Sequence, residues 1–227
     1  IAKAVMPHDH DHVLADVHLA GPEEVALAIA AADRAKDFWS RMPWEERVAI
    51  FLKAAELLAG PYRDVLNAAT VLGQSKTCHQ AESDAACETI DYLRFNAYFA
   101  SKIYAEQPLS PLDQLNRMEY RPLEGFVLAI SPFNFTAIAS NLNLAPVLMG
   151  NTTVWKPAGT ALLSNHLLMR ILLEAGLPPG VVNFVPAPGA AIGRAALARP
   201  ELGGLHFTGS NATFNTLWRN IADRIDG

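Results

Sequence analysis

The second half of the chain alternates short apolar or β-branched runs with single helical segments, and this alternation restricts the fold more than any other feature. Runs rich in Val, Ile, Phe and Thr predict four strands, at 124–131, 151–156, 181–185 and 205–208. Apolar residues at helical spacing predict a helix after each strand, at 137–149, 160–175, 190–198 and 211–225. Strands that are separated by single helices predict a parallel sheet with right-handed crossovers.

The first half has a helical period instead. Apolar positions predict four helices. One begins at Pro22, and a second follows Pro43 and ends at Gly60. A third ends at Gly73, and a fourth covers 77–104. Thr77 is well placed to cap the fourth helix. The fold class predicted for the chain is therefore α/β. An N-terminal helical layer over 1–120 precedes a partial doubly wound, Rossmann-like parallel sheet over 121–227.

Composition excludes several classes of protein. With 227 residues, 51% of them hydrophobic and 18% charged, the chain is long and apolar enough to bury a core. Its formal net charge of −5 argues against a nucleic-acid partner, since phosphate binding favours a basic surface. Two cysteines, Cys78 and Cys87, make no disulfide scaffold and are typical of a reduced, intracellular protein. Residues 125–155 carry no charge, but prolines and asparagines interrupt them, so we expect no membrane span.

Ligands of doubly wound sheets bind beyond the carboxyl ends of the strands, so the residues that follow each predicted strand are the candidates for a site. Asn134 has an amide that can donate to an oxyanion, although an asparagine in such a turn can equally cap its helix. Lys156 can donate to hydroxyl groups, or it is an ordinary surface lysine. The small residues at 209–213 would let a phosphate approach a helix N-terminus, or they simply begin a capped helix.

The residues at these strand ends resemble a known family. The segments SPFNF, WKPA, GLPPGVVNFVPAPG and FTGS, in this order and spacing, are similar to those of the aldehyde dehydrogenase superfamily, and the resemblance covers most of the chain. SPFNFTAIASNLNLAPVLMGN, with FLKAAELLAGPYR, AESDAACETIDYLRFNAYFA and RPLEGF, most resembles the Δ1-pyrroline-5-carboxylate dehydrogenase branch. The resemblance implies NAD(P)-dependent oxidation of L-glutamate γ-semialdehyde to L-glutamate, a step of proline catabolism.

The resemblance also assigns roles to residues. It implies that Asn134 stabilises the oxyanion, and that Glu88 and Phe135 line the semialdehyde pocket rather than being a solvated carboxylate and a core aromatic. It implies that NAD contacts Ser131, Lys156, Gly189, Gly209, Ser210, Asn211, Ala212 and Thr213. Relatives often carry Glu or Asp where this chain has Gly159, so NADP is an alternative cofactor. The chain also has Phe133 where many relatives have Trp, and Thr136 where they have Pro.

Family chemistry also needs a cysteine nucleophile and a glutamate base, which the family places downstream of FTGS. No cysteine follows Cys87, so the resemblance implies an N-terminal portion. Residues 1–120 would form the helical segment of the cofactor domain and residues 121–227 part of its sheet, without the catalytic domain. We expect the isolated chain to be inactive. The family further implies a homo-oligomer in the cytoplasm, or in the mitochondrial matrix of a eukaryote.

Other interpretations compete with this one. The chain could belong to a dehydrogenase for another aldehyde, or it could be a non-catalytic nucleotide-binding module. A cysteine hydrolase using Cys78 and His79 is disfavoured, because adjacent residues on a helix point apart. The alternating histidines of residues 8–12 could bind a metal on one face of an extended segment, but no further ligand cluster supports this. We therefore predict no metal site.

Overall fold

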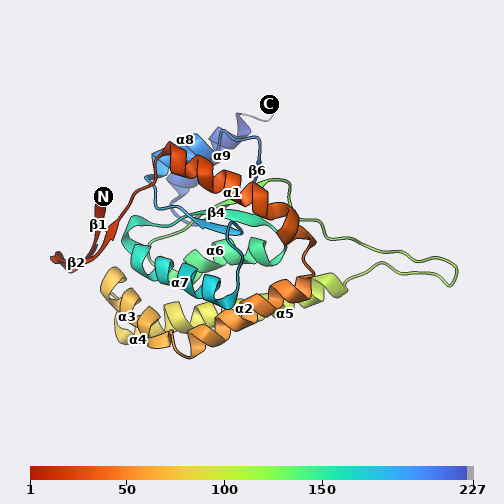
Figure 1. Cartoon of the computed structure of the whole chain (residues 1–227), viewed down its shortest axis with the longest axis horizontal. Coiled ribbons are helices and arrows are strands. Elements are labelled where there is room, and N and C mark those ends of the chain that lie inside the picture. The colour runs from red at the N-terminus through yellow and green to blue at the C-terminus, as the bar shows by residue number, and fades with distance from the viewer. Residues whose placement is uncertain (224–227) are drawn as a thin grey trace.

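The computed structural model describes residues 1–223, and a parallel sheet lies at its centre (Figure 1). Within these residues the sheet has four strands in the order β5–β4–β3–β6. They are β3 (Phe126–Ile130), β4 (Thr152–Lys156), β5 (Val182–Phe184) and β6 (Leu202–Phe207), and all neighbours are parallel. The chain runs outward from β3 to β5 and then returns beside β3 as β6. The sheet is therefore doubly wound, as predicted, and its switch point lies between β3 and β6.

Helices cover both faces of the sheet. On one face lie α6 (Thr136–Leu148) and α7 (Leu162–Ala175), which is preceded by a 3₁₀ turn, η2 (Gly159–Ala161). On the other face lie α8 (Gly189–Ala196) and α9 (Asn211–Ala222). Crossovers on opposite faces follow from the reversal of strand order, because a right-handed connection changes face when it changes direction.

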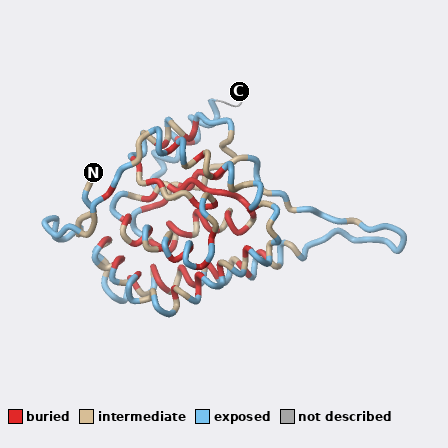
Figure 2. The backbone as a smooth tube through the Cα atoms, in the orientation of Figure 1, coloured by how far each residue is buried: buried red, intermediate tan, exposed pale blue. Residues whose placement is uncertain are grey.

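The N-terminal helix shares a core with the second of these faces. It is α1 (Pro22–Arg41), and its buried Val25 and Ile29 pack in one cluster with Phe126 and Leu128 of β3. The apolar side chains of α1 do not all face this core, because Leu27 is largely exposed. The buried residues form a continuous band through the sheet and the inner faces of the helices (Figure 2).

The remaining N-terminal helices form a further layer against α6 and α7 (Figure 1). This layer consists of α2 (Trp44–Ala59), α3 (Arg63–Gln74), α4 (Cys78–Ala81), η1 (Glu82–Cys87) and α5 (Glu88–Ala105). The predicted helix over 77–104 is thus interrupted, because η1 is a π-helical turn. The predicted N-terminal helices do not form one layer, because α1 lies on the opposite side of the sheet from α2, α3, α4 and α5.

A β-hairpin at the N-terminus was not predicted. The strands β1 (Ala2–Met6) and β2 (Asp9–Val17) pair antiparallel, with irregular register near their turn. Most residues of β2 are exposed, so the strand shows little of the alternation between apolar and polar residues that marks a half-buried strand. The hairpin contacts α3, and this tertiary contact is absent from any local pattern.

Some boundaries also differ from the prediction. Gly73 does not end α3, because it is buried inside the helix, and Ser75 takes the left-handed conformation at the C-cap instead (φ 52°). The strand predicted at 205–208 begins earlier, at Leu202, and includes Gly203. A Cβ at Gly203 would lie 2.1 Å from the carbonyl oxygen of Glu124, so glycine is needed where these segments approach. The predicted end of the last helix, at residue 225, lies outside the described residues.

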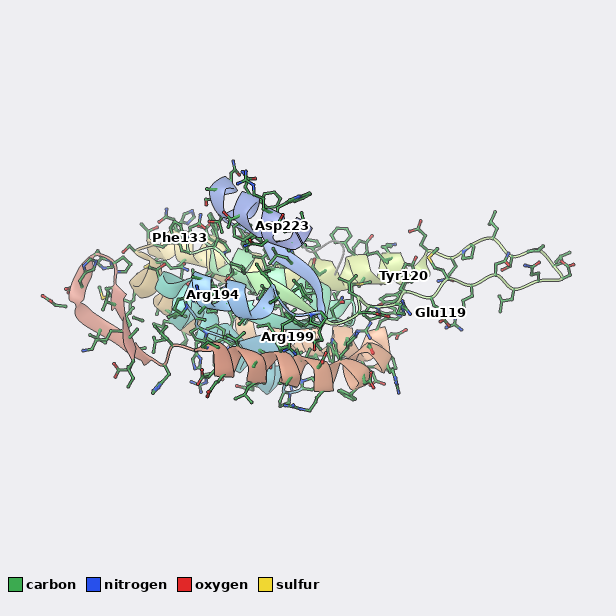
Figure 3. All side chains as sticks on the ribbon, turned by 90° about the horizontal axis from the view of Figure 1, so that it is seen from above. Glu119, Tyr120, Phe133, Arg194, Arg199 and Asp223 are labelled. Atoms are coloured by element: carbon green, nitrogen blue, oxygen red, sulfur yellow. The ribbon has the colours of Figure 1, made fainter. Side chains whose placement is uncertain are left out.

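Residues 106–125 connect α5 to β3 without a helix or strand, and we call residues 106–121 the arm. At its base, Tyr120 Oη donates a hydrogen bond to the carbonyl oxygen of Glu106 (2.9 Å). Seen from above, the arm projects from the body beyond Tyr120 and Glu119 (Figure 3). Three leucines on it are largely exposed, namely Leu109, Leu112 and Leu115.

None of the helices in residues 1–223 combines the length and the apolar character that crossing a membrane requires.

Candidate functional site

The carboxyl ends of β4, β3 and β6 form one edge of the sheet, which we call the carboxyl rim. The amide of Ser131 donates to the carbonyl oxygen of Lys156 (3.2 Å), so the segments after β3 and β4 lie side by side. The amide of Thr208 donates to the carbonyl oxygen of Ile130 (3.3 Å), which joins β6 to the same place. The predicted residues that follow these three strands are therefore neighbours on the rim, on both sides of the switch point.

Asn134 lies exposed between β3 and α6. The N-cap of α6 is Phe135, in an extended conformation, and no side chain among the described residues caps the helix. The alternative in which Asn134 caps its helix is therefore wrong. Within residues 1–223 the Asn134 side chain has no hydrogen-bond partner, so both of its N–H groups are free to donate to a ligand at the rim.

Two further rim residues lie deeper. Ser131 is buried, and its hydroxyl accepts a hydrogen bond from Nε1 of Trp155 (2.9 Å), which holds the end of β3 against β4. Lys156 is half-buried at the end of β4, and burial lowers its pKa because desolvation disfavours the charged ammonium. Among the described residues no carboxylate forms an ion pair with Lys156. Hydroxyl or anionic groups of a ligand would therefore satisfy a cation that the protein leaves unpaired.

The N-terminus of α9 offers backbone donors on the other side of the switch point. Ser210 is its N-cap, and the Ser210 hydroxyl accepts from the amide of Thr213 (3.2 Å). The amides of Asn211 and Ala212 lie in the first turn, where a helix supplies no acceptor, and no other described residue accepts from them. Free amides and the positive end of the helix dipole make this turn suitable for an anion such as a diphosphate.

Glycines leave open space near the rim. Gly189 is the first residue of α8, and Gly159 begins η2 after β4. Both are exposed, and a Cβ built at either position would meet no atom within 4 Å. Gly209 differs, because a Cβ there would lie 2.5 Å from Cζ of Phe207, so a side chain would displace that ring.

Helices α5 and α6 run in the same direction. Midway along them, Nδ2 of Asn96 donates to Oδ1 of Asn141 (2.7 Å). Near their C-terminal ends, Arg47 donates both to Tyr104 Oη (2.9 Å) and to the carbonyl oxygen of Leu148 (2.9 Å). Their N-terminal ends must therefore also lie close together, and η1, which leads into α5, contacts α6.

This parallel arrangement brings the predicted substrate residues towards the rim. Glu88 is the half-buried first residue of α5, and its carboxylate accepts from Tyr92 Oη (2.8 Å). Burial, together with this hydrogen bond, raises the pKa of Tyr92 to about 12. Phe135 is half-buried beside Asn134 at the start of α6, with Nζ of Lys76 4.0 Å from its ring centroid. Glu88 and Phe135 thus lie at the N-terminal ends of α5 and α6, the same end at which Asn134 lies.

Sequence reasoning missed a polar cluster beneath this site. The buried Thr136 Oγ1 lies within hydrogen-bond distance of Thr70 Oγ1 (3.3 Å), Gln74 Oε1 (3.3 Å) and Ser164 Oγ (3.0 Å). Its hydroxyl ties the start of α6 to α3 and α7. The sequence did contain one signal for this cluster: Thr136 stands where many relatives have proline. A buried hydroxyl at that position needs hydrogen-bond partners, so partners could have been expected.

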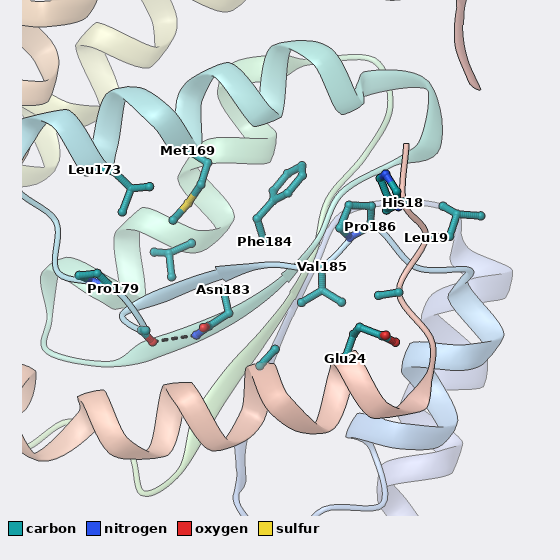
Figure 4. A pocket seen from close by; sticks show the side chains of 14 residues that line it. His18, Leu19, Glu24, Met169, Leu173, Pro179, Asn183, Phe184, Val185 and Pro186 are labelled. Carbon is teal, nitrogen blue, oxygen red and sulfur yellow. Dashed lines mark hydrogen bonds between the residues drawn. The ribbon is translucent and has the colours of Figure 1, made fainter. Parts of the chain in front are cut away.

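A groove of about 600 Å³ lies along β5, between α1 and α7 (Figure 4). Apolar side chains, including those of Met169 and Phe184, line it together with His18 and Glu24. Asn183 borders it and donates to the carbonyl oxygen of Gly180 (2.7 Å). None of the predicted site residues lines this groove.

The alternating histidines lie at the turn of the hairpin and on β2. His8 Nδ1 lies 2.6 Å from Ser75 Oγ, and His10 and His12 lie on the exposed strand β2. Within residues 1–223, no three His, Cys, Asp or Glu side chains are arranged to hold a metal ion.

Comparison with known proteins adds independent evidence. The profile of the aldehyde dehydrogenase family matches residues 2–226. The chain is 52% identical over 227 residues to the delta-1-pyrroline-5-carboxylate dehydrogenase of Agaricus bisporus, covering 100% of this chain and 41% of that protein. It is 50% identical over 220 residues to the mitochondrial enzyme of that name from Bos taurus, covering 97% of this chain and 39% of the bovine protein.

A solved structure resembles the fold closely. The NAD-bound delta-pyrroline-5-carboxylate dehydrogenase of Mycobacterium tuberculosis superposes with a TM-score of 0.96 at 51% identity, covering 99% of this chain and 42% of that one. The chain thus spans about two fifths of the length of the proteins it matches. Because the profile covers nearly all of the chain, and the sheet and its rim have the expected topology, this chain belongs to the aldehyde dehydrogenase family.

Proposed function

We propose that the chain is the N-terminal part of a NAD-dependent enzyme that oxidises L-glutamate γ-semialdehyde, the open form of Δ1-pyrroline-5-carboxylate, to L-glutamate. The proposal is supported by two sets of free donors that follow neighbouring strands: the Asn134 amide after β3, and the backbone amides of the first turn of α9 after β6. Relatives about half identical to the chain, which bear the name of this enzyme, support the choice of substrate.

The rim has the donors that a dinucleotide needs. Asn211 and Ala212 would donate to the diphosphate from the first turn of α9, whose N-cap is held by Ser210 and Thr213. Lys156 would donate to ribose hydroxyls, and its half-buried, unpaired ammonium fits that role. The open surface at Gly189 leaves room for the adenine, while Gly209, which has no side chain, leaves the Phe207 ring in place before α9. NAD, when bound, supplies the acceptor for a hydride.

Asn134 would act on the aldehyde itself. When a nucleophile attacks the carbonyl carbon, negative charge develops on the oxygen, and a fixed amide donor stabilises that charge more than it stabilises the neutral aldehyde. The Asn134 amide is suited to this because no other described group competes for it. Ser131 would support the same segment from below through its contact with Trp155.

Glu88 and Phe135 would line the aldehyde pocket. A carboxylate is suited to the ammonium group of an amino-acid aldehyde, and an aromatic ring gives its methylene chain an apolar wall. The parallel packing of α5 and α6, which places both residues at the Asn134 end of the layer, supports this assignment. Gly159 leaves the ribose side without a carboxylate, so NADP is the alternative cofactor to be compared with NAD.

The cysteine nucleophile and the glutamate base would come from polypeptide outside these 227 residues, so that residues 1–120 and 121–227 together form the first part of the cofactor domain. We further propose a homo-oligomer in the cytoplasm, or in the mitochondrial matrix of a eukaryote. The exposed leucines of the arm support self-association, since solvated apolar side chains on a projecting segment gain by burial.

Activity of the protein that contains this chain tests the proposal. We expect NADH to form when it is given Δ1-pyrroline-5-carboxylate and NAD, and we expect less NADH with short aliphatic aldehydes at equal concentration. Higher kcat/KM for another aldehyde would favour a different dehydrogenase. Calorimetric binding of NAD with no turnover of any aldehyde would favour the non-catalytic module.

A further inference from the structure

Lys76 is a half-buried cation close to the proposed aldehyde pocket. Its side chain is 12% exposed, and Nζ lies 2.8 Å from Oδ2 of Asp84. The same Nζ lies 4.0 Å from the centroid of the Phe135 ring. One ammonium group thus joins a carboxylate of η1 to the aromatic side chain at the N-cap of α6.

Local structure holds Lys76 in place from both sides. Ser75 ends α3 in the left-handed conformation, and Thr77 caps α4 by accepting from the amide of Gln80 (3.2 Å). Lys76 is the single residue between these two helix ends. Because the backbone is fixed immediately before and after it, the lysine can direct its side chain with little conformational freedom.

The π-helical turn η1 places the carboxylate. Asp84 lies in the middle of η1, where the wider turn changes the direction of side chains relative to a continuous α-helix. Three residues after Asp84 the turn ends, and α5 begins with Glu88. The pair Lys76–Asp84 therefore belongs to the same short region as the proposed pocket residue Glu88.

Phe135 transmits the contact to Asn134. The ring faces Lys76, the preceding residue is Asn134, and the following residue is Thr136, which hydrogen bonds anchor to α3 and α7. With Thr136 fixed below and the Phe135 ring fixed by the cation, the backbone that carries Asn134 has support on its C-terminal side.

We propose that Lys76, oriented by Asp84, is a positioning residue that fixes the Phe135 ring as a pocket wall and thereby fixes the Asn134 amide. This inference rests on the proposed function, because the pocket and the donor are those assigned above. A cation whose charge is shared between a carboxylate and a ring face holds that ring in one orientation, which a neutral side chain of equal length cannot do.

Kinetics of the protein that contains this chain provide the first test. We expect Lys76→Met to lower kcat/KM for Δ1-pyrroline-5-carboxylate by about tenfold, the scale of one desolvated cation–π contact, with the KM for NAD unchanged. Lys76→Arg keeps a cation that stacks on rings and should restore most of the loss. Lys102→Met is the matched control, because Lys102 lies over Tyr98 (5.1 Å) on α5 and should leave both constants unchanged.

Hydrogen exchange of the same variants gives a readout that needs no turnover. We expect Lys76→Met to speed amide exchange in residues 133–138, with no such change in the Lys102→Met variant. Faster exchange in a protein that oxidises no aldehyde would contradict the proposed function and still support the positioning role. Unchanged exchange in residues 133–138, or equal losses of kcat/KM in the Met and Arg variants, would overturn the inference.

Discussion

Arg47 offers the sharpest test of how the layers are held together. It lies on α2, is 3% exposed, and has no carboxylate partner among the described residues. Its guanidinium donates to the carbonyl oxygens of Leu148 (2.9 Å), Trp39 (3.4 Å) and Met42, and to Tyr104 Oη (2.9 Å). Three of these acceptors are carbonyls at the C-terminal ends of α1 and α6. One buried cation therefore satisfies the carbonyls of Met42 and Leu148, which the two helices leave unpaired, whereas the carbonyl of Trp39 also accepts from the amide of Met42 (3.3 Å).

Replacing Arg47 with Met keeps the apolar stem and removes all four hydrogen bonds. Burial lowers the pKa of Arg47, yet a guanidinium stays charged, so its removal also relieves a cost of desolvation. An unsatisfied buried carbonyl costs about 1–3 kcal/mol. With the carbonyls of Met42 and Leu148 left without a partner, and part of this loss offset by the relieved desolvation, we expect the free energy of unfolding to fall by about 3 kcal/mol.

Urea unfolding followed by tryptophan fluorescence measures this change, with Trp39 and Trp44 close to the site of substitution. The control is Arg41→Met, because Arg41 is 80% exposed and forms only a surface ion pair with Asp37 (3.7 Å). That variant should change stability by less than about 0.5 kcal/mol. If Arg47→Met unfolds at the same urea concentration as the parent protein, then the guanidinium does not hold these layers together and the reasoning fails.

Three further predictions concern the site and the thiols. Lys156→Met should weaken NAD binding about tenfold in a calorimetric titration, because one donor is lost, and an unchanged affinity would place the ribose elsewhere. In the protein that contains this chain, Asn134→Ala should lower kcat about 10²–10³-fold with little change in NAD affinity, as loss of one oxyanion donor does. The pKa of the Cys87 thiol is raised, mainly because the thiol is partly buried and secondly because the Glu82 carboxylate lies nearby. Peptide mass spectrometry should therefore find the exposed Cys78 alkylated by iodoacetamide before Cys87 at neutral pH, with the difference narrowing as pH rises. Equal rates at neutral pH would contradict this.

Much of the central architecture could be predicted from local patterns. The four parallel strands and the helices between them follow from runs of apolar residues and from stop signals such as Gly176, which has φ 105° at the end of α7. The cap at Thr77 was predicted from its residue type and is confirmed. These features depend on residues only a few positions apart, so a linear pattern contains the information that determines them.

Other features depended on contacts between distant segments. The hairpin β1–β2 has too little apolar alternation to be predicted, and the turn η1 interrupts a segment whose pattern reads as one helix. From the sequence, Asn134 could be a helix-capping residue or a donor to a ligand. Only the backbone showed that Phe135, and not Asn134, is the N-cap of α6. Lys76 and Phe135 lie far apart in the chain, so nothing local indicated their contact.

The sequence by itself determined where the strands and helices follow one another along the chain, and which residues come directly after each strand. Periodicity and turn chemistry are local, so a linear pattern contains them. Tertiary structure alone decided which helices cover which face and that α5 runs parallel to α6, since packing joins residues that are distant in the chain. It also decided that the amide of Asn134 is free while the hydroxyl of Ser131 is engaged. Whether a polar group is satisfied depends on its neighbours in space, and residue type does not record them.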